Sequence, residues 1–484
     1  MNCCEIVAPE VTVDSASAPV HFDLAVLGGG SAGFAAAIRG AEQGARVALI
    51  EGGTLGGTCV NVGCVPSKTL IRAAEAQHRR GHHPFAGVSR SEQTPDWAQI
   101  REQKDDLVDQ LRQDKYSDVL GAYDTIQLFA QRGIFASPRE IRLANGRSIV
   151  AEKVVVTTGA SPWVPPVPGL AEVDFLDNVS AMALERLPAS LFVIGTGFIA
   201  VELGQMFARL GVRVTLLGRK NRVLSGEDPD VGAALTNYLR DEGITVRTGT
   251  VIEQVSRSDR YHLSIVTEGR SEVLEADALL VAAGRRANTA GFGLEAIGAT
   301  LGPHGEIVVD AHLETTAPGV YAAGDVVGDP MFVYVAAYAG ALAAGNALSS
   351  TRRALDLTAV PQVTFTDPAV ASVGLSETAA RAQGLDVLVS QLAMEHVPRA
   401  LAARDTRGFV KLIADSTTRQ IVGAQILAAE AGEMILEPTL AIKYGLTIDD
   451  LTSTFHPYLT LSEGVKLAAQ TFDRDVAKLS CCSA

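Results

Sequence analysis

Residues 22–51, FDLAVLGGGSAGFAAAIRGAEQGARVALIE, contain the pattern that decides the fold of this chain. An apolar strand leads into a glycine-rich turn, an alanine-rich helix follows, and a second apolar strand ends at Glu51. This order is typical of a dinucleotide-binding βαβ unit. Residues 191–218, LFVIGTGFIAVELGQMFARLGVRVTLLG, repeat the design. We therefore expect two dinucleotide-binding units, arisen by internal duplication.

The first glycine turn has a glycine at each position that the motif requires. Gly28 allows the tight turn, Gly30 lets the backbone approach a pyrophosphate, and Gly33 lets the helix pack closely on the strand. The helix N-terminus adds positive potential for phosphates. Glu51, 18 residues after Gly33, is expected to accept hydrogen bonds from ribose hydroxyls. A glycine turn without a ligand is the alternative, and the complete βαβ context argues against it.

The second turn differs from the first at its acidic end. Its motif positions are occupied by Gly195, Gly197 and Ala200. Eighteen residues after Ala200 the chain has Gly218 instead of an acid, and the next basic residues are Arg219, Lys220 and Arg222. This pattern favours the 2′-phosphate of NADPH over the free ribose of NADH, with Arg219 and Arg222 as candidate contacts. A solvated basic turn is the alternative.

A pair of cysteines lies in residues 56–68, GGTCVNVGCVPSK. Two residues five apart in a straight α-helix have Cα atoms about 8 to 9 Å apart, too far for a disulfide. If Cys59 and Cys64 pair, the helix must be distorted, and Gly63 and Pro66 provide the means. A helix N-terminus here would stabilise a thiolate. Buried structural cysteines and metal ligation are the alternatives, although no further Cys or His cluster completes a zinc site.

The composition excludes several classes of protein. The 484 residues suffice for about three domains, and the formal charge of -14 argues against a nucleic-acid partner. The six cysteines form three close pairs, the other two being Cys3/Cys4 and Cys481/Cys482, which favours redox or soft-metal chemistry over a disulfide scaffold. No secretory signal precedes the first strand, so we expect a cytoplasmic protein. The uncharged run 330–351 is expected to be a buried helix and not a membrane span.

At this point the chain resembles a known family, the FAD-dependent pyridine nucleotide disulfide oxidoreductases. The resemblance covers about residues 20–475 and rests on GGGSAG with Glu51, GGTCVNVGCVPSK, TTGA at 157–160, GTGFIAVELG and AAGD at 322–325. It implies an α/β fold with two Rossmann-like domains and a C-terminal α+β dimerisation domain. The domains expected are a flexible N-terminal tail (1–20), a split FAD domain (21–160 and 285–355), an NADPH domain (161–284), a dimerisation domain (360–472) and a mobile tail (473–484).

The resemblance also implies roles for individual residues. Asp325 would contact the ribityl and phosphate region of FAD, with Thr58 and Gly159 as further FAD contacts. Lys68 and Glu202 match an ion pair beside the flavin. Cys64 matches the thiol that touches the flavin ring, and Cys59 the thiol that exchanges with substrate. Phe198 occupies a position where other members often have a tyrosine over the flavin.

Two features distinguish this chain within the family. Members that reduce disulfides carry HPTxxE near the end, where the histidine is the general acid and base. The segment here is HPYLTLSEG, and aligning the acid on Glu463 puts Tyr458, not His456, at that position. A phenol, with a pKa of about 10 when free, serves dithiol chemistry poorly.

The tail, ending LSCCSA, and residues 397–412 resemble the branch of the family that reduces Hg(II), although the amino-terminal metal-carrier domain of many such members is missing. A vicinal thiol pair suits a soft cation. The resemblance implies a homodimer in which NADPH and FAD keep Cys59 and Cys64 reduced. Cys481 and Cys482 of the partner subunit would deliver Hg(II) received from small thiols. The alternatives are a thioredoxin-reductase-like enzyme and a metal-sequestering relic without catalysis.

Overall fold

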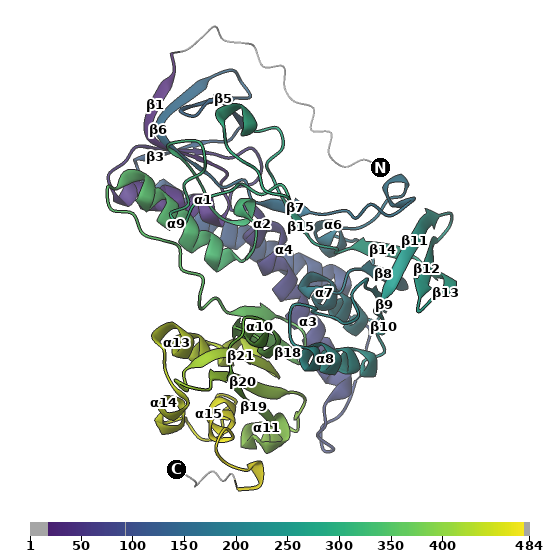
Figure 1. Cartoon of the computed structure of the whole chain (residues 1–484). Helices are drawn as coiled ribbons and strands as arrows, with labels where there is room; N and C mark the ends of the chain where they lie inside the picture. Colours follow the sequence, from purple (N-terminus) through teal and green to yellow (C-terminus); the bar gives the residue numbers. More distant parts are fainter. Residues whose placement is uncertain (1–17, 92, 479–484) are drawn as a thin grey trace. The chain divides into compact units, whose positions relative to one another are not determined.

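The computed structural model describes residues 18–91 and 93–478, and the chain divides into two compact units (Figure 1). The first unit combines the chain up to Pro66 with 104–163 and 285–355, and the second combines 67–103, 164–284 and the chain from 356 onward. Two helices contain residues of both units: α3 (Cys64–His82) and α4 (Trp97–Arg112).

A seven-stranded sheet forms the core of the first unit. The strand order is β3-β2-β1-β6-β5-β4, and β16 also pairs with β6. The strands around β1 are parallel, and β4 and β5 form an antiparallel extension. Residues 24–27 and 47–50 are buried throughout, as expected for parallel strands covered on both faces. The strands are β1 (Val20–Leu27), β2 (Val47–Ile50), β3 (Ile126–Phe129), β4 (Gly133–Ser137), β5 (Glu140–Leu143), β6 (Ser148–Val156) and β16 (Val320–Ala322), with a separate pair β7 (Ala160–Pro162) and β15 (Arg285–Ala287).

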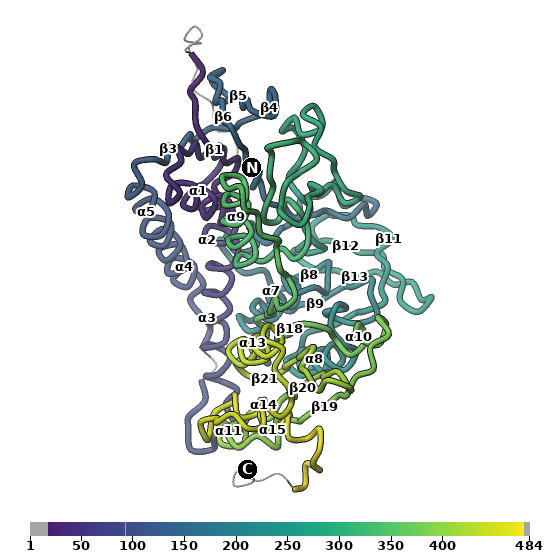
Figure 2. The backbone as a smooth tube through the Cα atoms, turned by 60° about the vertical axis from the view of Figure 1, so that its left-hand side comes forward, coloured from purple at the N-terminus to yellow at the C-terminus, as the bar shows by residue number. Residues whose placement is uncertain are grey.

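Two helices of the first unit, α1 (Ser31–Glu42) and α9 (Val333–Leu348), pack side by side, as Figures 1 and 2 both show. A Cβ on Gly340 would lie 2.0 Å from the Ala32 carbonyl oxygen, so only glycine permits this approach. The uncharged run 330–351 thus forms a packed helix, and none of the described helices has both the length and the apolar character to cross a membrane. The other helices of this unit are α2 (Gly57–Val62), a π-helix (Gln113–Ser117), α5 (Asp118–Gly121) and 3₁₀ turns at Glu295–Ile297 and Asp325–Val327.

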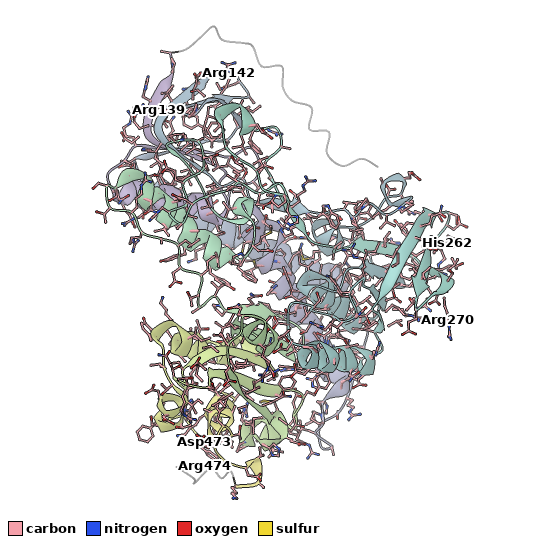
Figure 3. The ribbon with its side chains drawn as sticks, in the orientation of Figure 1. Arg139, Arg142, His262, Arg270, Asp473 and Arg474 are labelled. Carbon is pink, nitrogen blue, oxygen red and sulfur yellow. The ribbon has the colours of Figure 1, made fainter. Side chains whose placement is uncertain are left out.

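The second unit begins with a parallel sheet in the order β10-β9-β8-β14, followed by an antiparallel sheet β11-β12-β13. His262 projects from the central strand β12 and Arg270 from the outer strand β13 (Figure 3), and a charged side chain such as Arg270 on an outer strand opposes edge-to-edge association. The elements are a 3₁₀ turn (Leu170–Glu172), α6 (Asn178–Met182), β8 (Ser190–Ile194), α7 (Phe198–Arg209), β9 (Arg213–Leu217), α8 (Pro229–Asp241), β10 (Thr245–Arg247), β11 (Thr250–Arg257), β12 (Tyr261–Thr267), β13 (Arg270–Ala276) and β14 (Ala278–Val281).

The C-terminal part of the second unit is an antiparallel sheet in the order β17-β18-β21-β20-β19, covered by short helices. Its strands are β17 (Gln362–Thr364), β18 (Ala369–Gly374), β19 (Val387–Ala393), β20 (Phe409–Asp415) and β21 (Ile421–Ala428). Its helices are α10 (Glu377–Ala382), α11 (Pro398–Ala403), α12 (Ala431–Met434), α13 (Leu436–Tyr444), α14 (Ile448–Ser453) and α15 (Glu463–Gln470), with 3₁₀ turns at Met394–His396 and Val476–Lys478. The predicted mixed α/β fold class is confirmed.

Candidate functional site

The first glycine turn connects β1 to α1 and leaves no room for side chains. Gly28 has φ +113°, and a Cβ there would lie 2.4 Å from the Thr157 carbonyl oxygen. A Cβ on Gly33 would lie 1.8 Å from the Gly28 carbonyl oxygen. Gly30 caps α1 without a side-chain hydrogen bond, and no acidic residue occupies the first turn of that helix. The amide groups of α1 are therefore available to an anion, as a pyrophosphate site requires.

Glu51 closes the first unit's turn. Its carboxylate accepts hydrogen bonds from the backbone N–H groups of Gly29, at 2.5 Å, and Gly53, at 2.6 Å. The acid at the end of β2 is thus held beside the glycine turn, where the motif places a ribose. The residues present fit the adenosine diphosphate part of FAD.

The TTGA and AAGD segments also meet within the first unit. Gly159 has φ +70°, and Asn288 donates from its side chain to the Thr158 carbonyl, which joins TTGA to the strand pair β7–β15. Asp325 begins a 3₁₀ turn, and its Oδ2 lies 3.8 Å from Nε of Arg285. Burial raises the pKa of Asp325, and Arg285 opposes that rise. A half-buried carboxylate with a cation nearby fits a group that receives hydrogen bonds from a ligand.

The two candidate thiols lie on either side of a broken helix. Helix α2 ends at Val62, Gly63 has φ −126° and ψ −107°, and α3 begins at Cys64. A Cβ on Gly63 would lie 2.9 Å from the Thr58 carbonyl oxygen, so the break is packed tightly. Cys59 and Cys64 are both half-buried. The distortion that pairing would require is therefore present at Gly63, one of the two residues that the sequence indicated.

Asn61 braces the thiol segment from within the same helix. Its side-chain amide donates to the carbonyls of Leu55, at 3.0 Å, and Gly57, at 2.9 Å. Its Oδ1 accepts from Arg112 at 3.1 Å. The segment carrying the cysteines is thereby fixed to the end of α4.

Two tyrosines that sequence reasoning missed lie near the thiols. Tyr116 belongs to the π-helix 113–117, and its ring packs on Phe34 with centroids 4.7 Å apart. Burial raises the pKa of Tyr116, a hydrogen bond to Ser31 opposes the rise, and negative charge on Cys59 and Cys64 adds to it. Burial also raises the pKa of Tyr334, at the start of α9, to about 12, and negative charge on Cys64 adds to the rise. Two phenols are thus neutral groups close enough to feel the charge of the thiol pair.

Lys68 and Glu202 form the predicted ion pair within the second unit. Lys68 Nζ lies 2.8 Å from Glu202 Oε2, and Glu202 is 4% exposed. Glu202 Oε1 accepts the backbone N–H of Phe365 at 2.8 Å, and the ammonium lies 4.6 Å from the centroid of the Phe365 ring. A carboxylate and an aromatic face therefore hold the charge of Lys68 in one place. Phe365 could not be found from the sequence because it lies 163 residues from Glu202.

The second glycine turn repeats the backbone conformation of the first at its first two motif positions. Gly195 has φ +132°, and a Cβ there would lie 2.2 Å from the Ala282 carbonyl oxygen. Gly197 caps α7 without a side-chain hydrogen bond. Ala200, at the third motif position, is completely buried. This turn fits the pyrophosphate of a second dinucleotide.

Gly218 and the basic residues after it lie at the end of β9. A Cβ on Gly218 would meet the Thr196 side chain at 2.4 Å, so an acid has no room there. Arg219 is exposed. Arg222 instead donates from Nη2 to the carbonyls of Ser225, at 3.2 Å, and Glu227, at 3.3 Å. Arg219 is thus available to a 2′-phosphate, whereas part of the Arg222 guanidinium is occupied by its own loop.

The remaining predicted residues lie in the C-terminal part of the second unit. Tyr458 is 61% exposed. His456 is buried and its Nε2 lies 2.7 Å from Glu437 Oε1, which raises the pKa of the imidazole. Glu463 is buried, and within residues 18–91 and 93–478 its Oε2 has no hydrogen-bond partner. The structure therefore does not join Tyr458 or Glu463 to His456, and Cys481 and Cys482 lie outside the described residues.

Helix α13 carries an apolar stripe on its exposed side. Leu436, Leu440 and Tyr444 recur every four residues and are 59%, 43% and 69% exposed. Phe455, on the loop before Tyr458, is 97% exposed. Such a surface is typical of an interface with another chain.

Comparison with known proteins gives consistent matches along the chain. Residues 22–340 match the pyridine nucleotide-disulphide oxidoreductase family, and residues 360–469 match its dimerisation domain. Mercuric reductase from Staphylococcus aureus is 46% identical over 463 residues, which cover 96% of this chain and 84% of that protein. Mercuric reductase from Streptomyces lividans is 46% identical over 469 residues, which cover 96% and 98%.

Solved structures give the same result. The HOCl-induced flavoprotein disulfide reductase RclA from Escherichia coli aligns with a TM-score of 0.83 at 31% identity, covering 93% of this chain and 99% of that one. LpdA from Mycobacterium tuberculosis aligns with a TM-score of 0.83 at 28% identity, covering 94% and 100%. Since the family match extends over residues 22–340 and these relatives align over nearly their whole length, this chain belongs to the pyridine nucleotide-disulphide oxidoreductase family and is an FAD-dependent oxidoreductase.

Proposed function

We propose that this chain reduces Hg(II) to Hg(0) with electrons from NADPH, through FAD and the thiols of Cys59 and Cys64. The observation that carries the proposal is the pair of half-buried thiols, Cys59 and Cys64, on either side of the helix break at Gly63. The relatives at 46% identity named mercuric reductase support it.

The protein's own residues prepare the thiol pair. When bound, FAD supplies a two-electron carrier between the nicotinamide and the thiols. Gly28, Gly30 and Glu51 would hold its adenosine diphosphate part, and Thr58, Gly159 and Asp325 would contact the remainder. Lys68, fixed by Glu202 and Phe365, would place a positive charge at the flavin. Gly63 breaks the helix between the two cysteines, which would allow both thiols to bind one ion.

Soft-metal exchange explains why thiols are used in pairs. Hg(II) prefers thiolate ligands, and each exchange is an associative attack by an incoming thiolate, as in thiol–disulfide exchange. In the proposal, Cys481 and Cys482 of the partner subunit take Hg(II) from small thiols and pass it to Cys59 and Cys64. Because each of the two binding sites has two thiols, the ion can be transferred between them without being released to solvent. This relay requires a homodimer, which the dimerisation-domain match and the exposed stripe on α13 support.

Tyr458 distinguishes this reaction from disulfide reduction. A disulfide must collect protons as it is cleaved, which a group of near-neutral pKa assists. Reduction of Hg(II) to the neutral atom needs no proton on the metal. The nearby imidazole of His456 is already engaged with Glu437, which leaves the exposed phenol of Tyr458 to orient or release a thiolate in the partner's site.

The decisive experiment measures NADPH oxidation by the purified holoenzyme with Hg(II) in excess small thiol, while elemental mercury vapour is collected. Oxidised glutathione and oxidised thioredoxin are tested in parallel. We expect mercury vapour in a 1:1 ratio to NADPH and little turnover with either disulfide. Faster turnover with a disulfide than with Hg(II) would reject the proposal.

Cysteine variants separate the two thiol pairs. Replacement of Cys59 or Cys64 by Ala should abolish turnover with every mercury ligand. Replacement of both Cys481 and Cys482 by Ala should leave reduction of the flavin by NADPH intact and impair turnover of thiol-bound Hg(II). A tail variant with unchanged activity at high competing thiol would rule out the relay.

A further inference from the structure

Residues 222–228 lead from the basic residues of the second unit to helix α8, and this loop is joined to the second glycine turn. The backbone N–H of Leu224 donates to the carbonyl of Thr196, between Gly195 and Gly197, at 2.9 Å. Leu224 has φ +45° and is 7% exposed, so a buried leucine occupies a conformation that residues with a side chain rarely adopt. Such a conformation persists only where surrounding contacts hold it.

Glu227, near the end of this loop, directs its carboxylate to the C-terminal sheet. Its Oε1 accepts from Ser372 Oγ of β18 at 3.0 Å, and its Oε2 accepts from Gln425 Nε2 of β21 at 2.9 Å. Its backbone N–H donates to the Leu224 carbonyl at 2.9 Å. Burial raises the pKa of the Glu227 carboxyl, and the hydrogen bonds from Ser372 and Gln425 oppose the rise. The sheet therefore fixes the loop three residues after Leu224.

Asp228, the next residue, makes a second link to the C-terminal part of the unit. It is the N-cap residue of α8, but its side chain does not cap that helix. Its carboxylate instead accepts from the backbone N–H groups of Glu377, at 3.0 Å, and Thr378, at 3.1 Å, where α10 begins. Lys411 Nζ of β20 lies 3.1 Å from Asp228 Oδ2, and the two residues are 4% and 1% exposed. A carboxylate that could cap its own helix thus attaches that helix to β20 and α10.

We infer that Glu227 and Asp228 are positioning residues for the nicotinamide coenzyme. Through them the C-terminal sheet holds loop 222–228, and with it the second glycine turn, in the conformation that binds NADPH. Their carboxylates are occupied by the C-terminal part of the unit, so they act on the coenzyme through the loop and not by contact. The inference goes beyond mercury reduction, because any acceptor would draw its electrons from the same coenzyme.

Two variants of Glu227 separate the hydrogen bonds from the shape of the side chain. Glu227→Ala removes both hydrogen bonds to the sheet. Glu227→Gln keeps the shape and can still accept from Ser372. After the Gln425 amide turns over, the new amide can also donate to Gln425 Oε1, a buried oxygen without a hydrogen-bond partner in the described part of the chain. We therefore expect the Ala variant to loosen the loop and the Gln variant to retain it.

Coenzyme affinity is measured by calorimetric titration of the oxidised holoenzyme with NADP+, which cannot reduce the flavin. In Glu227→Ala the Kd should rise about fivefold, the effect of losing roughly one net hydrogen bond, while Glu227→Gln stays within about twofold of the wild type. Stopped-flow reduction of the flavin by NADPH should show a higher half-saturating concentration and an unchanged limiting rate, because neither carboxylate takes part in hydride transfer. Amide hydrogen exchange should accelerate in residues 218–228.

Ser390→Ala is the matched control. Ser390 is buried in β19 of the same sheet, and its hydroxyl donates to the Ala468 carbonyl of α15 at 2.6 Å. The variant therefore loses a buried hydrogen bond of the sheet that does not involve residues 222–228. Its Kd for NADP+ and its hydrogen exchange in residues 218–228 should equal those of the wild type.

An unchanged Kd in Glu227→Ala, or an equal rise in Ser390→Ala, would overturn the inference. A lower limiting rate of flavin reduction with an unchanged Kd would do the same. None of these measurements uses mercury, so they remain valid if the proposed reduction of Hg(II) fails.

A second variant serves if Glu227→Ala does not retain FAD. Asp228→Asn keeps the size of the side chain and removes the charge that faces Lys411. Its Kd for NADP+ should rise about threefold, since a charge-assisted contact becomes a neutral one. An unchanged Kd in this variant would likewise overturn the inference.

Discussion

The first and second glycine turns have nearly the same backbone conformation at their first two glycines. The two units differ in the residue that follows or ends their second strand. Gly28 and Gly195 both have large positive φ, and each would push a Cβ into a carbonyl oxygen of the neighbouring strand or its end. Gly30 and Gly197 both cap a helix in extended conformation without a side-chain hydrogen bond. After its second strand the first unit has Glu51, whose carboxylate accepts hydrogen bonds from two backbone N–H groups. The second unit has the buried Gly218 at the corresponding position.

The comparison separates what binds any dinucleotide from what selects one. The shared backbone exposes helix amides to a pyrophosphate in either unit, so it cannot discriminate between cofactors. The difference lies at the end of the second strand, where Glu51 offers a carboxylate and Gly218 followed by Arg219 offers a cation. Discrimination therefore depends on very few side chains, and each can be changed separately.

The largest effect is expected at the third motif position. Gly33→Ala would place a methyl group 1.8 Å from a backbone oxygen, so we expect a loss of about 3 kcal/mol or more in the free energy of unfolding and poor FAD retention. Ala200→Gly in the second unit should cost about 1 kcal/mol and retain FAD. Denaturant titration and the ratio of absorbance at 450 and 280 nm measure both. Equal losses in the two variants would contradict the conclusion that the first turn alone excludes a methyl group at this position.

A somewhat smaller effect is expected at the acid of the first unit. Glu51→Gln removes the charge that accepts hydrogen bonds from Gly29 and Gly53, and we expect FAD affinity to fall by about 2 kcal/mol. Asp23→Asn is the control, because Asp23 also accepts a backbone amide, that of Arg46 at 2.7 Å, away from the turn. Equilibrium dialysis of FAD compares them. The same loss of FAD in Asp23→Asn would contradict a specific role for Glu51.

The basic turn of the second unit tests cofactor selection. The wild type should prefer NADPH, and Arg219→Gln should lower the ratio of kcat/KM for NADPH to that for NADH about tenfold. Arg222→Gln should chiefly lower thermal stability, since Arg222 donates to the carbonyls of Ser225 and Glu227. If wild-type NADH equals or exceeds NADPH, or if only Arg222→Gln changes the ratio, our assignment of this turn is wrong.

The smallest effect concerns the strand ends that face the two turns. Thr157 donates its hydroxyl to the carbonyls of Leu27, at 3.1 Å, and Gly28, at 2.9 Å, whereas Ala282 faces Gly195 without a hydroxyl. Thr157→Ala should lower the free energy of unfolding by about 1 kcal/mol. Urea titration measures this loss, and Thr157→Ser, which keeps the hydroxyl, is the matched control. An unchanged free energy of unfolding in Thr157→Ala would mean that this hydroxyl does not stabilise the first turn.

The glycine positions could be predicted because their constraint is local. A tight turn before a helix demands small residues at fixed spacing, so both dinucleotide units and the break at Gly63 follow from the sequence. The roles of Lys68 and Glu202 came from resemblance, since the sequence alone gives no sign that two residues 134 apart meet.

The environment of the thiols could not be predicted for a different reason. The position of Tyr116 depends on a π-helix, which has no sequence signature as clear as that of a glycine turn. Tyr334 lies at the start of a helix far along the chain from the two cysteines. Arg222 matched the basic pattern, but its direction depends on a loop that closes on its own side chain. Periodicity gives the face of a regular helix, not the direction of a side chain in an irregular turn.

The π-helix has a consequence for how this protein can change by insertion and deletion. A π-turn holds one residue more than an α-turn, so loss of a single codon within 113–117 would restore regular helix while the helical turns on either side keep their mutual register. Only side chains within the turn would change direction, so Tyr116 would lose its packing on Phe34. Descendants of this gene could thus lose the Tyr116 phenol near the thiols in one step while keeping both cysteines, both dinucleotide units and every motif by which they would be recognised as kin.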